Sequence, residues 1–232
     1  NTRKASKEEH NDLLDMLIQT KYEDGSGMND QQLLEEAIIL YVAGHETSAN
    51  AMAWMWYLVS MKPETEEKVL QSVNDSIGDQ DPSFEKLRAL GYCLQVIEET
   101  MRIYPPAWIV DRKPLADDTF EGIPIKKEND ILCLIYGVHR SERYWKDPET
   151  FDPERFTPEN KAKQVPFSYM PFGGGPRLCI GNNFALMEMQ FVLAMMIKRY
   201  RFKLVEDQTI EINPLITLRP RYGIKVVVSK RK

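Results

Sequence analysis

The residues with the clearest chemical potential are one cysteine and the glycines in front of it. Cys179 follows Gly173, Gly174 and Gly175 and precedes a segment, from Asn182 onward, whose residues favour a helix. This spacing predicts a sulfur at a helix N-terminus, where free backbone N–H groups stabilise a thiolate. Such a thiolate can be the axial ligand of an iron porphyrin, in which it favours O–O cleavage. The alternative is a buried structural cysteine in a turn.

A second motif places an acid beside an alcohol within the longest helical pattern, from Asp30 to Met61. Gly44 costs such a helix roughly 1 kcal/mol relative to alanine, and the Thr47 hydroxyl can bond the carbonyl of Ala43. We expect a local widening of the helix, which would make a groove for a small ligand such as O₂. Glu46 and Thr47 together can deliver protons. The alternative is a helix-packing glycine with incidental polar neighbours.

A third pattern is an acid and a base three residues apart in a helical segment from about residue 90 to 104. Glu99 and Arg102 therefore share a helix face and can pair. Taken alone, this spacing is common, and its default interpretation is a surface ion pair that adds little stability.

The three patterns, in their order along the chain, resemble motifs of the cytochrome P450 family. The segment from Phe172 to Gly181 matches the haem-binding pattern Phe-x-x-Gly-x-Arg-x-Cys-x-Gly, and residues 43–48 match the distal-helix motif at each fixed position. Glu99 and Arg102 match the family's Glu-x-x-Arg, which is followed here by Pro-Glu-Arg-Phe at 153–156. The resemblance runs from about residue 29 to the C-terminus. It implies a mainly α fold with small β-sheets, namely the C-terminal half of the P450 fold.

The resemblance also implies a role for each catalytic and structural residue. Cys179 would ligate the iron of haem b, and Glu46 and Thr47 would deliver protons during oxygen activation. A buried triad would hold the region behind the haem without taking part in the chemistry, and such a triad needs all its donors and acceptors satisfied. Its members would be Glu99, Arg102 and Arg155.

Cofactor and substrate contacts follow from the same resemblance. Arg112 and Arg177 would bind the haem propionates, a bidentate use that suits arginine, although Arg112 could instead be a surface residue at a strand end. Phe172 would shield the thiolate and tune the iron, and Gly181 belongs to the same cofactor-binding loop. The expected substrate contacts are Ala43, Ala107, Trp108, Ile109, Ile216 and Thr217.

The function implied is a haem-thiolate monooxygenase that activates O₂ and inserts one oxygen atom into a small apolar substrate. Its electrons would come from an NAD(P)H-dependent reductase or from a ferredoxin- or flavodoxin-type donor. Two alternatives stay open: a peroxide-driven peroxygenase or isomerase on the same fold, and a haem-free fragment with only a structural or interaction role. We expect residues 1–232 to be the C-terminal portion of a single P450 domain. Its N-terminal half is absent from this chain and could lie on a companion chain, which would leave an apolar side of the long helix exposed.

Composition restricts the class of protein. A 43% hydrophobic content allows a sizeable core, and a formal net charge of −5 argues against a nucleic-acid partner. The three cysteines, Cys93, Cys133 and Cys179, have no paired spacing, so a reducing compartment such as the cytoplasm is expected. Basic residues gather late, at 198, 199, 201, 203 and 230–232. They could be a solvated helix end and tail, or a docking surface for an acidic redox protein.

The elements that must position these residues follow from periodicity and breakers. Helices are expected at about 8–21, 30–61, 63–77, 90–104 and from the Cys179 loop to about 199. Asn29 and Gln32 form a capping-box pattern for the second helix, whose half from Ala49 to Val59 is apolar nearly all round and should be buried. An irregular, Pro-rich stretch is expected at about 146–171. Strands are expected at 108–112, 119–125, 130–134, 202–205, 211–212, 216–218 and 224–228.

Overall fold

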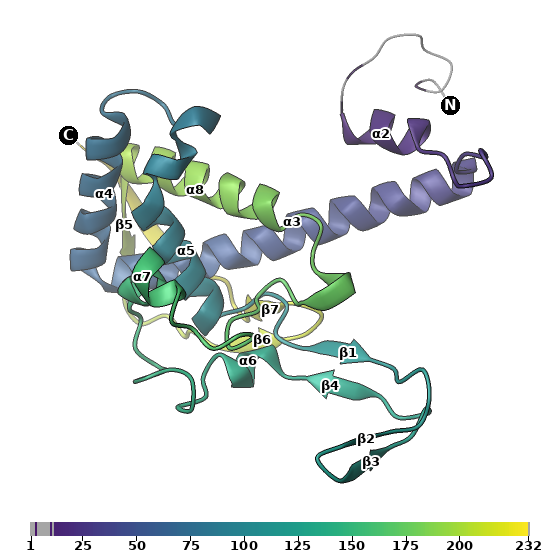
Figure 1. The fold of residues 1–232 in the computed structure, drawn as a ribbon. Helices are drawn as coiled ribbons and strands as arrows, with labels where there is room; N and C mark the ends of the chain where they lie inside the picture. Colours follow the sequence, from purple (N-terminus) through teal and green to yellow (C-terminus); the bar gives the residue numbers. More distant parts are fainter. Residues whose placement is uncertain (1–2, 4–9, 11, 232) are drawn as a thin grey trace. The chain divides into compact units, whose positions relative to one another are not determined.

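A computed structural model of the chain describes Arg3, His10 and residues 12–231 (Figure 1). The chain forms two compact units, residues 1–46 and 47–232. The boundary between them falls inside helix α3 (Asp30–Met61), a single continuous α-helix.

The first unit contains α2 (Leu13–Gln19) and the N-terminal part of α3. The predicted capping box is present: the Asn29 side chain accepts from the Gln32 N–H at 2.9 Å, and the Gln32 side chain accepts from the Asn29 N–H at 3.0 Å. Helix α2 is shorter than predicted, because the Asp12 carboxylate caps it; positions 8, 9 and 11 lie outside the described residues. The expected exposed apolar surface is found on α3, at Leu34, Ile38, Ile39, Tyr41 and Val42.

The second unit is built around four helices: the C-terminal part of α3, α4 (Pro63–Ile77), α5 (Gly91–Ile103) and α8 (Asn182–Arg199). Apolar side chains spaced three or four residues apart give each helix one buried face, and these faces meet in one core (Figure 1). Met55 of α3, Val73 of α4, Ile97 of α5 and Leu193 of α8 are at most 1% exposed. The bounds of α3 and α4 agree with those predicted.

Several short helices were not predicted, because one or two turns are too short to show a helical period. They are η1 (Phe84–Ala89), α6 (Ile135–Val138), η2 (Pro153–Phe156), α7 (Pro158–Lys161) and η3 (Gly175–Arg177). Two of them, η2 and α7, lie in the stretch that was predicted to be irregular.

The described strands pair into four small antiparallel sheets. The pairs are β1 (Val110–Arg112) with β4 (Ile131–Cys133), β2 (Asp118–Phe120) with β3 (Ile123–Ile125), β5 (Tyr200–Leu204) with β8 (Val226–Lys230), and β6 (Ile212–Pro214) with β7 (Leu218–Pro220). The single strand predicted at 119–125 is wrong. It is a hairpin, because Glu121 and Gly122 both have positive φ and reverse the chain.

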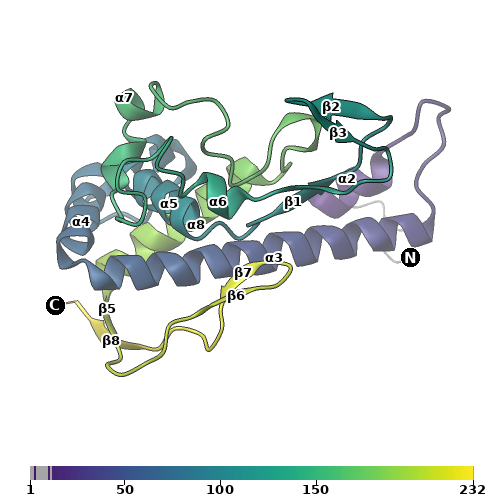
Figure 2. The same ribbon diagram turned by 90° about the horizontal axis from the view of Figure 1, so that it is seen from below.

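Two of the sheets lie on one side of the C-terminal part of α3, opposite the helices. Figure 2 shows β5–β8 and β6–β7 on one side of this segment and α4, α5 and α8 on the other. The architecture is thus mainly α-helical with small sheets, as expected. No helix among the described residues is long and apolar enough to cross a membrane.

Candidate functional site

The loop from Pro171 to Gly181 presents the sulfur of Cys179 to solvent. The N–H of Cys179 donates to the carbonyl of Phe172 at 3.1 Å, which closes the loop on itself. Gly181 is the N-cap of α8, so the sulfur-bearing residue comes two positions before that cap. The interpretation of Cys179 as a buried structural cysteine is therefore wrong, whereas the helix N-terminus predicted after it is present.

Two glycines give this loop its shape. Gly173 and Gly175 have φ values of +74° and +69°, in the left-handed region that other residues avoid. The backbone of this loop therefore requires glycine at these two positions, which accounts for the glycines that mark the motif in the sequence. These two residues fold the chain back so that Cys179 lies at its surface.

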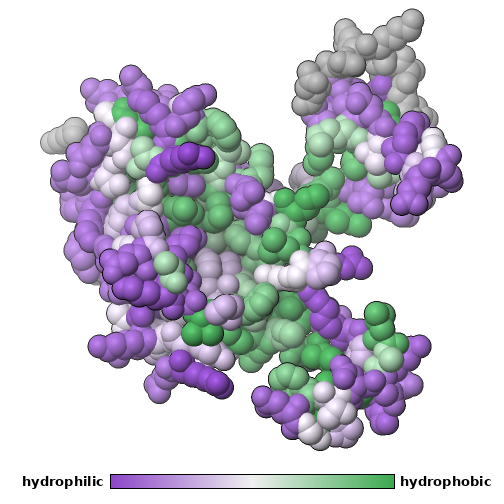
Figure 3. Space-filling model, viewed as in Figure 1, coloured by the Kyte–Doolittle hydropathy of each residue, from purple (hydrophilic) through white to green (hydrophobic). Residues whose placement is uncertain are grey.

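The surface around Cys179 is apolar with one cation. Leu178, Ile180 and Phe184 are 51%, 92% and 64% exposed, an unusual solvent exposure for large apolar side chains. Figure 3 shows hydrophobic surface in the middle of this view, while hydrophilic side chains concentrate over α4 and α7. Arg177 is exposed in the same loop, and no carboxylate among the described residues pairs with it. Such a surface suits a flat apolar ligand that carries negative groups at its edge.

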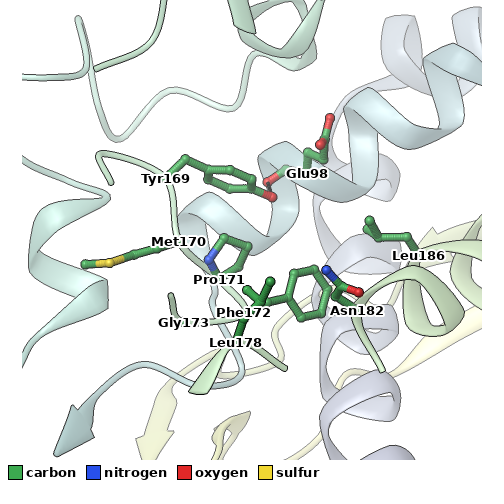
Figure 4. Close-up of a pocket in the computed structure, with 9 residues that line it drawn as sticks. All are labelled: Glu98, Tyr169, Met170, Pro171, Phe172, Gly173, Leu178, Asn182 and Leu186. Carbon is green, nitrogen blue, oxygen red and sulfur yellow. Dashed lines mark hydrogen bonds between the residues drawn. The ribbon is translucent and has the colours of Figure 1, made fainter. Parts of the chain in front are cut away.

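A pocket of about 200 Å³ lies between the loop, Glu98 of α5 and the start of α8 (Figure 4). Phe172, Leu178 and Leu186 form its apolar wall, and Asn182 adds an amide. Phe172 also packs against the main core, so the loop rests on the helices beneath it.

Behind the loop, the structure brings Glu99, Arg102 and Arg155 together. Arg102 donates from Nε and Nη2 to the two carboxylate oxygens of Glu99 at 2.7 and 2.9 Å, and both side chains are fully buried. Arg155 Nε lies 3.4 Å from Glu99 Oε1. Burial raises the pKa of the Glu99 carboxyl, and the hydrogen bonds from Arg102 oppose that effect. The surface-pair interpretation of Glu99 and Arg102 is thus wrong, because other segments cover this face of α5.

Those covering segments satisfy the remaining groups of the pair. Arg102 donates Nη1 to the carbonyl of His139 at 2.9 Å and Nη2 to the carbonyl of Thr150 at 3.2 Å. The N–H of Asp152 donates to Glu99 Oε1 at 2.9 Å. The buried ions therefore have the hydrogen bonds that a buried pair needs.

Arg112 ends β1 and is exposed. Its Nη1 donates to the carbonyl of Asp111 at 2.7 Å, and no carboxylate among the described residues forms an ion pair with it. Its guanidinium keeps further donors for an anionic group.

The acid–alcohol motif lies on α3. Glu46 and Thr47 are adjacent at the boundary of the two units, and α3 is α-helical through both. A Cβ atom added at Gly44 would meet no other atom within 4 Å outside the local helix backbone. Gly44 is therefore not a helix-packing glycine in this structure, and the space beside it is open.

The six predicted substrate residues fall into different environments. Trp108 Nε1 donates to the carbonyl of Leu215 at 2.8 Å, which joins the segment after α5 to the turn before β7. Ile216 at that turn is 93% exposed, whereas Thr217 is 5% exposed and accepts from Asn50 Nδ2 at 3.0 Å. Thr217 thus has little surface left for a ligand. Ala107 and Ile109 are partly buried, and Ala43 lies in the first unit.

Comparison with known proteins decides the family. The cytochrome P450 family pattern matches residues 1–228. The chain belongs to the cytochrome P450 family. It is 35% identical over 227 residues to rat cytochrome P450 4F5, covering 96% of this chain and 43% of that protein. It is 34% identical over 212 residues to the Arabidopsis thaliana protein LUTEIN DEFICIENT 5, chloroplastic, covering 89% of this chain and 36% of the relative.

A solved structure confirms the fold. "Retinoic acid bound cyanobacterial CYP120A1" matches with a TM-score of 0.94 and 29% identity, covering 99% of this chain and 53% of that one. The predicted P450 fold is thus confirmed. The chain spans about half the length of this structure and less than half of the two relatives.

Membership in the P450 family implies haem, and the residues present are compatible with it. The thiol of Cys179 is exposed, the side chains beside it are apolar, and Arg177 and Arg112 carry positive charge without a carboxylate partner among the described residues. An exposed cysteine sulfur, an apolar surface and two guanidinium groups without a carboxylate partner among the described residues match an iron porphyrin with its two propionates.

Most of the late basic residues make contacts within the chain. Lys198 donates to the carbonyls of Gly78 and Gln80, at 2.6 and 3.0 Å. Arg199 pairs with Asp81, Arg201 with Glu66 and Glu67, Lys203 with Glu206, and Arg231 with Glu66. Lys230, at the end of β8, is exposed; residue 232 lies outside the described part. Acids of the chain thus neutralise part of this basic cluster.

Sequence reasoning missed His139, Trp145 and Asn50. The His139 ring accepts from the N–H of Met170, Trp145 donates to the carbonyl of Ser168, and Asn50 holds Thr217. Each contact joins segments 23 to 167 residues apart, so no local spacing could have revealed it.

Proposed function

We propose that this chain supplies the haem-thiolate centre of a monooxygenase, with Cys179 as the ligand of the iron of haem b. The observation that carries the proposal is the exposed Cys179 thiol at the end of a glycine loop, before the N-terminus of α8, in a chain of the P450 family. When bound, an iron porphyrin with a thiolate ligand supplies the cleavage of the O–O bond.

The loop and β1 orient the cofactor. Arg112 and Arg177 would donate hydrogen bonds to the propionate carboxylates, for which their planar guanidinium groups are suited. Phe172 lies between the loop and the core and limits the access of water to the thiolate. Gly181 keeps the loop free of a side chain next to the sulfur, since a Cβ atom there would lie 3.9 Å from Cys179 Sγ.

Helix α3 provides the proton path and part of the substrate wall. Glu46 and Thr47 supply a carboxyl and a hydroxyl, each of which can hold and pass a proton. The open space beside Gly44 gives room for O₂. The substrate is a small apolar molecule, and its contacts are Ala43, Ala107, Trp108, Ile109 and Ile216. Thr217 supports this wall from behind.

The whole reaction requires more than these residues. We propose that residues 1–232 form the C-terminal portion of a single P450 domain, because the chain spans about half of its structural relative. The exposed apolar side of α3 is then a face that the other portion covers. Electrons come from an NAD(P)H-dependent reductase or from a ferredoxin- or flavodoxin-type donor, in a reducing compartment such as the cytoplasm.

The test is the carbon monoxide difference spectrum of the reduced protein, with Cys179→Ser and Cys133→Ser as a matched pair. Cys133 is a second unpaired, partly exposed cysteine, on β4. We expect a strongly red-shifted Soret band in the wild type and in Cys133→Ser, and its loss in Cys179→Ser. A shifted band that survives Cys179→Ser, or a wild type that binds no haem, refutes the proposal.

A further inference from the structure

The buried pair Glu99–Arg102 and the Cys179 loop are separate in sequence, and one residue contacts both regions. His139 follows α6 directly and is fully buried. Its carbonyl accepts from Arg102 Nη1 at 2.9 Å, and its ring atom Nε2 accepts from the N–H of Met170 at 2.9 Å. Met170 is the last residue before the loop that carries Cys179.

The hydrogen bonds continue from Met170 into the loop. The carbonyl of Met170 accepts from the N–H of Gly173 at 3.0 Å, and the carbonyl of Phe172 accepts from the N–H of Cys179 at 3.1 Å. The position of the Met170 peptide therefore determines where the turn at Gly173 begins. The position of this turn then determines where the loop closes on Cys179.

The segment Ser168–Met170, which we term the lead-in segment, is fixed at each of its residues. Trp145 Nε1 donates to the carbonyl of Ser168 at 3.2 Å, and the Tyr169 hydroxyl donates to the carbonyl of Glu98 at 3.0 Å. The His139 ring stacks on Tyr169 with centroids 5.3 Å apart. Of these contacts, the one at Met170 lies nearest in sequence to Cys179.

The chemistry of the ring indicates that this contact is specific. Since Nε2 accepts a hydrogen bond, the proton of the neutral ring is on Nδ1. Burial lowers the pKa of His139 to about 4 and outweighs the interactions with the backbone of Arg102 and Met101, which raise that pKa, so the ring is neutral at pH 7. A neutral ring keeps the lone pair of Nε2, which accepts from the Met170 N–H.

We propose that His139 is a positioning residue for the thiolate: it transmits the rigidity of the Glu99–Arg102 pair to the lead-in segment and thereby fixes the Cys179 loop in its ligating shape. This inference rests on the proposed function, in which Cys179 ligates haem iron. It assigns His139 no contact with haem, substrate or the reacting atoms.

The test compares His139→Gln, His139→Leu and Val73→Ala in the full protein. A glutamine oxygen can replace Nε2 as the acceptor, and leucine cannot. Val73 is a fully buried residue of α4, so its truncation controls for lost core stability. Amide hydrogen exchange of residues 170–179 in the haem-free protein is measured first, because it needs no cofactor. The fraction of the reduced carbon monoxide complex with the red-shifted band is measured second.

We expect exchange in residues 170–179 to be about tenfold faster in His139→Leu, the factor that the loss of one ordinary buried hydrogen bond gives. The red-shifted fraction should fall in the same variant. His139→Gln should restore both, and Val73→Ala should change neither.

Several results would overturn the inference. One is a folded His139→Leu variant with wild-type exchange and spectrum. Another is a Val73→Ala variant in which exchange is faster and the red-shifted fraction is smaller to the same extent as in His139→Leu. If His139→Leu does not fold, a folded His139→Gln variant that lacks the red-shifted band overturns it. A wild type without haem refutes the proposed function instead, and the exchange measurement still decides whether His139 fixes the loop.

Discussion

Removing the negative charge of Glu99 should destabilise the protein far more than removing a charge from an exposed pair of similar geometry. In Glu99→Gln the Arg102 guanidinium stays fully buried and loses its counter-charge, since both side chains have no exposed surface. A buried ion left in this way costs about 3–5 kcal/mol of unfolding free energy. The matched control is Glu159→Gln. The Lys163–Glu159 distance is 2.6 Å, as short as the 2.7 Å between Arg102 and Glu99, but the two side chains are 66% and 79% exposed. Exposed pairs contribute about 0–1 kcal/mol.

A double replacement tests the cause of that cost. Glu99→Leu with Arg102→Met removes both charges and keeps an apolar volume, so it should recover part of the loss. Recovery should be incomplete by about 1–3 kcal/mol, because the carbonyls of His139 and Thr150 then lose the donor that Arg102 provides.

The assay is urea unfolding followed by far-ultraviolet circular dichroism, with the slope m required to stay constant across variants. The reasoning fails if Glu99→Gln and Glu159→Gln cost the same within about 1 kcal/mol, which is the upper end for an exposed pair. Contact distance, and not burial, would then set the strength of these pairs. The reasoning also fails if the double variant is less stable than Glu99→Gln alone.

Two further predictions concern the loop and its support. Gly173→Ala should lower the free energy of unfolding by about 1–2 kcal/mol, because the φ of Gly173, +74°, is in the left-handed region. The control is Gly91→Ala at the start of α5, where an added Cβ meets no atom within 4 Å, and it should not destabilise the protein. Urea midpoints measure both variants, and equal midpoints would contradict the backbone argument. In the folded protein the pKa of His139 is about 4, below its ordinary value of 6.5. As the pH falls, the unfolded chain therefore binds a proton at His139 before the folded protein does. The free energy of unfolding should thus fall by about 3 kcal/mol as the pH drops from about 6.5 to 4. The difference in unfolding free energy between wild type and His139→Gln over that range measures this, and a constant difference would show that His139 does not cause the loss.

The sequence determined the local features of this protein. The bounds of α3 follow from the Asn29–Gln32 capping box at one end and from Lys62-Pro63 at the other. The loop before α8 needs glycine at Gly173 and Gly175, whose positive φ values are a property of single residues. Caps, breakers and glycine-dependent turns act over a few residues, so they can be read before any tertiary contact is known.

Only the tertiary structure decided which charged pairs close in sequence are buried. Glu99–Arg102 on α5 and Lys203–Glu206 at the end of strand β5 are both oppositely charged pairs three residues apart, yet the first is fully buried and the second is 76% and 83% exposed. The same holds for His139, whose ring meets Met170 across 31 residues. Helical spacing states that two side chains share a face, whereas the cost of burying them depends on what packs against that face. That information lies in residues far along the chain, which only the folded structure brings next to them.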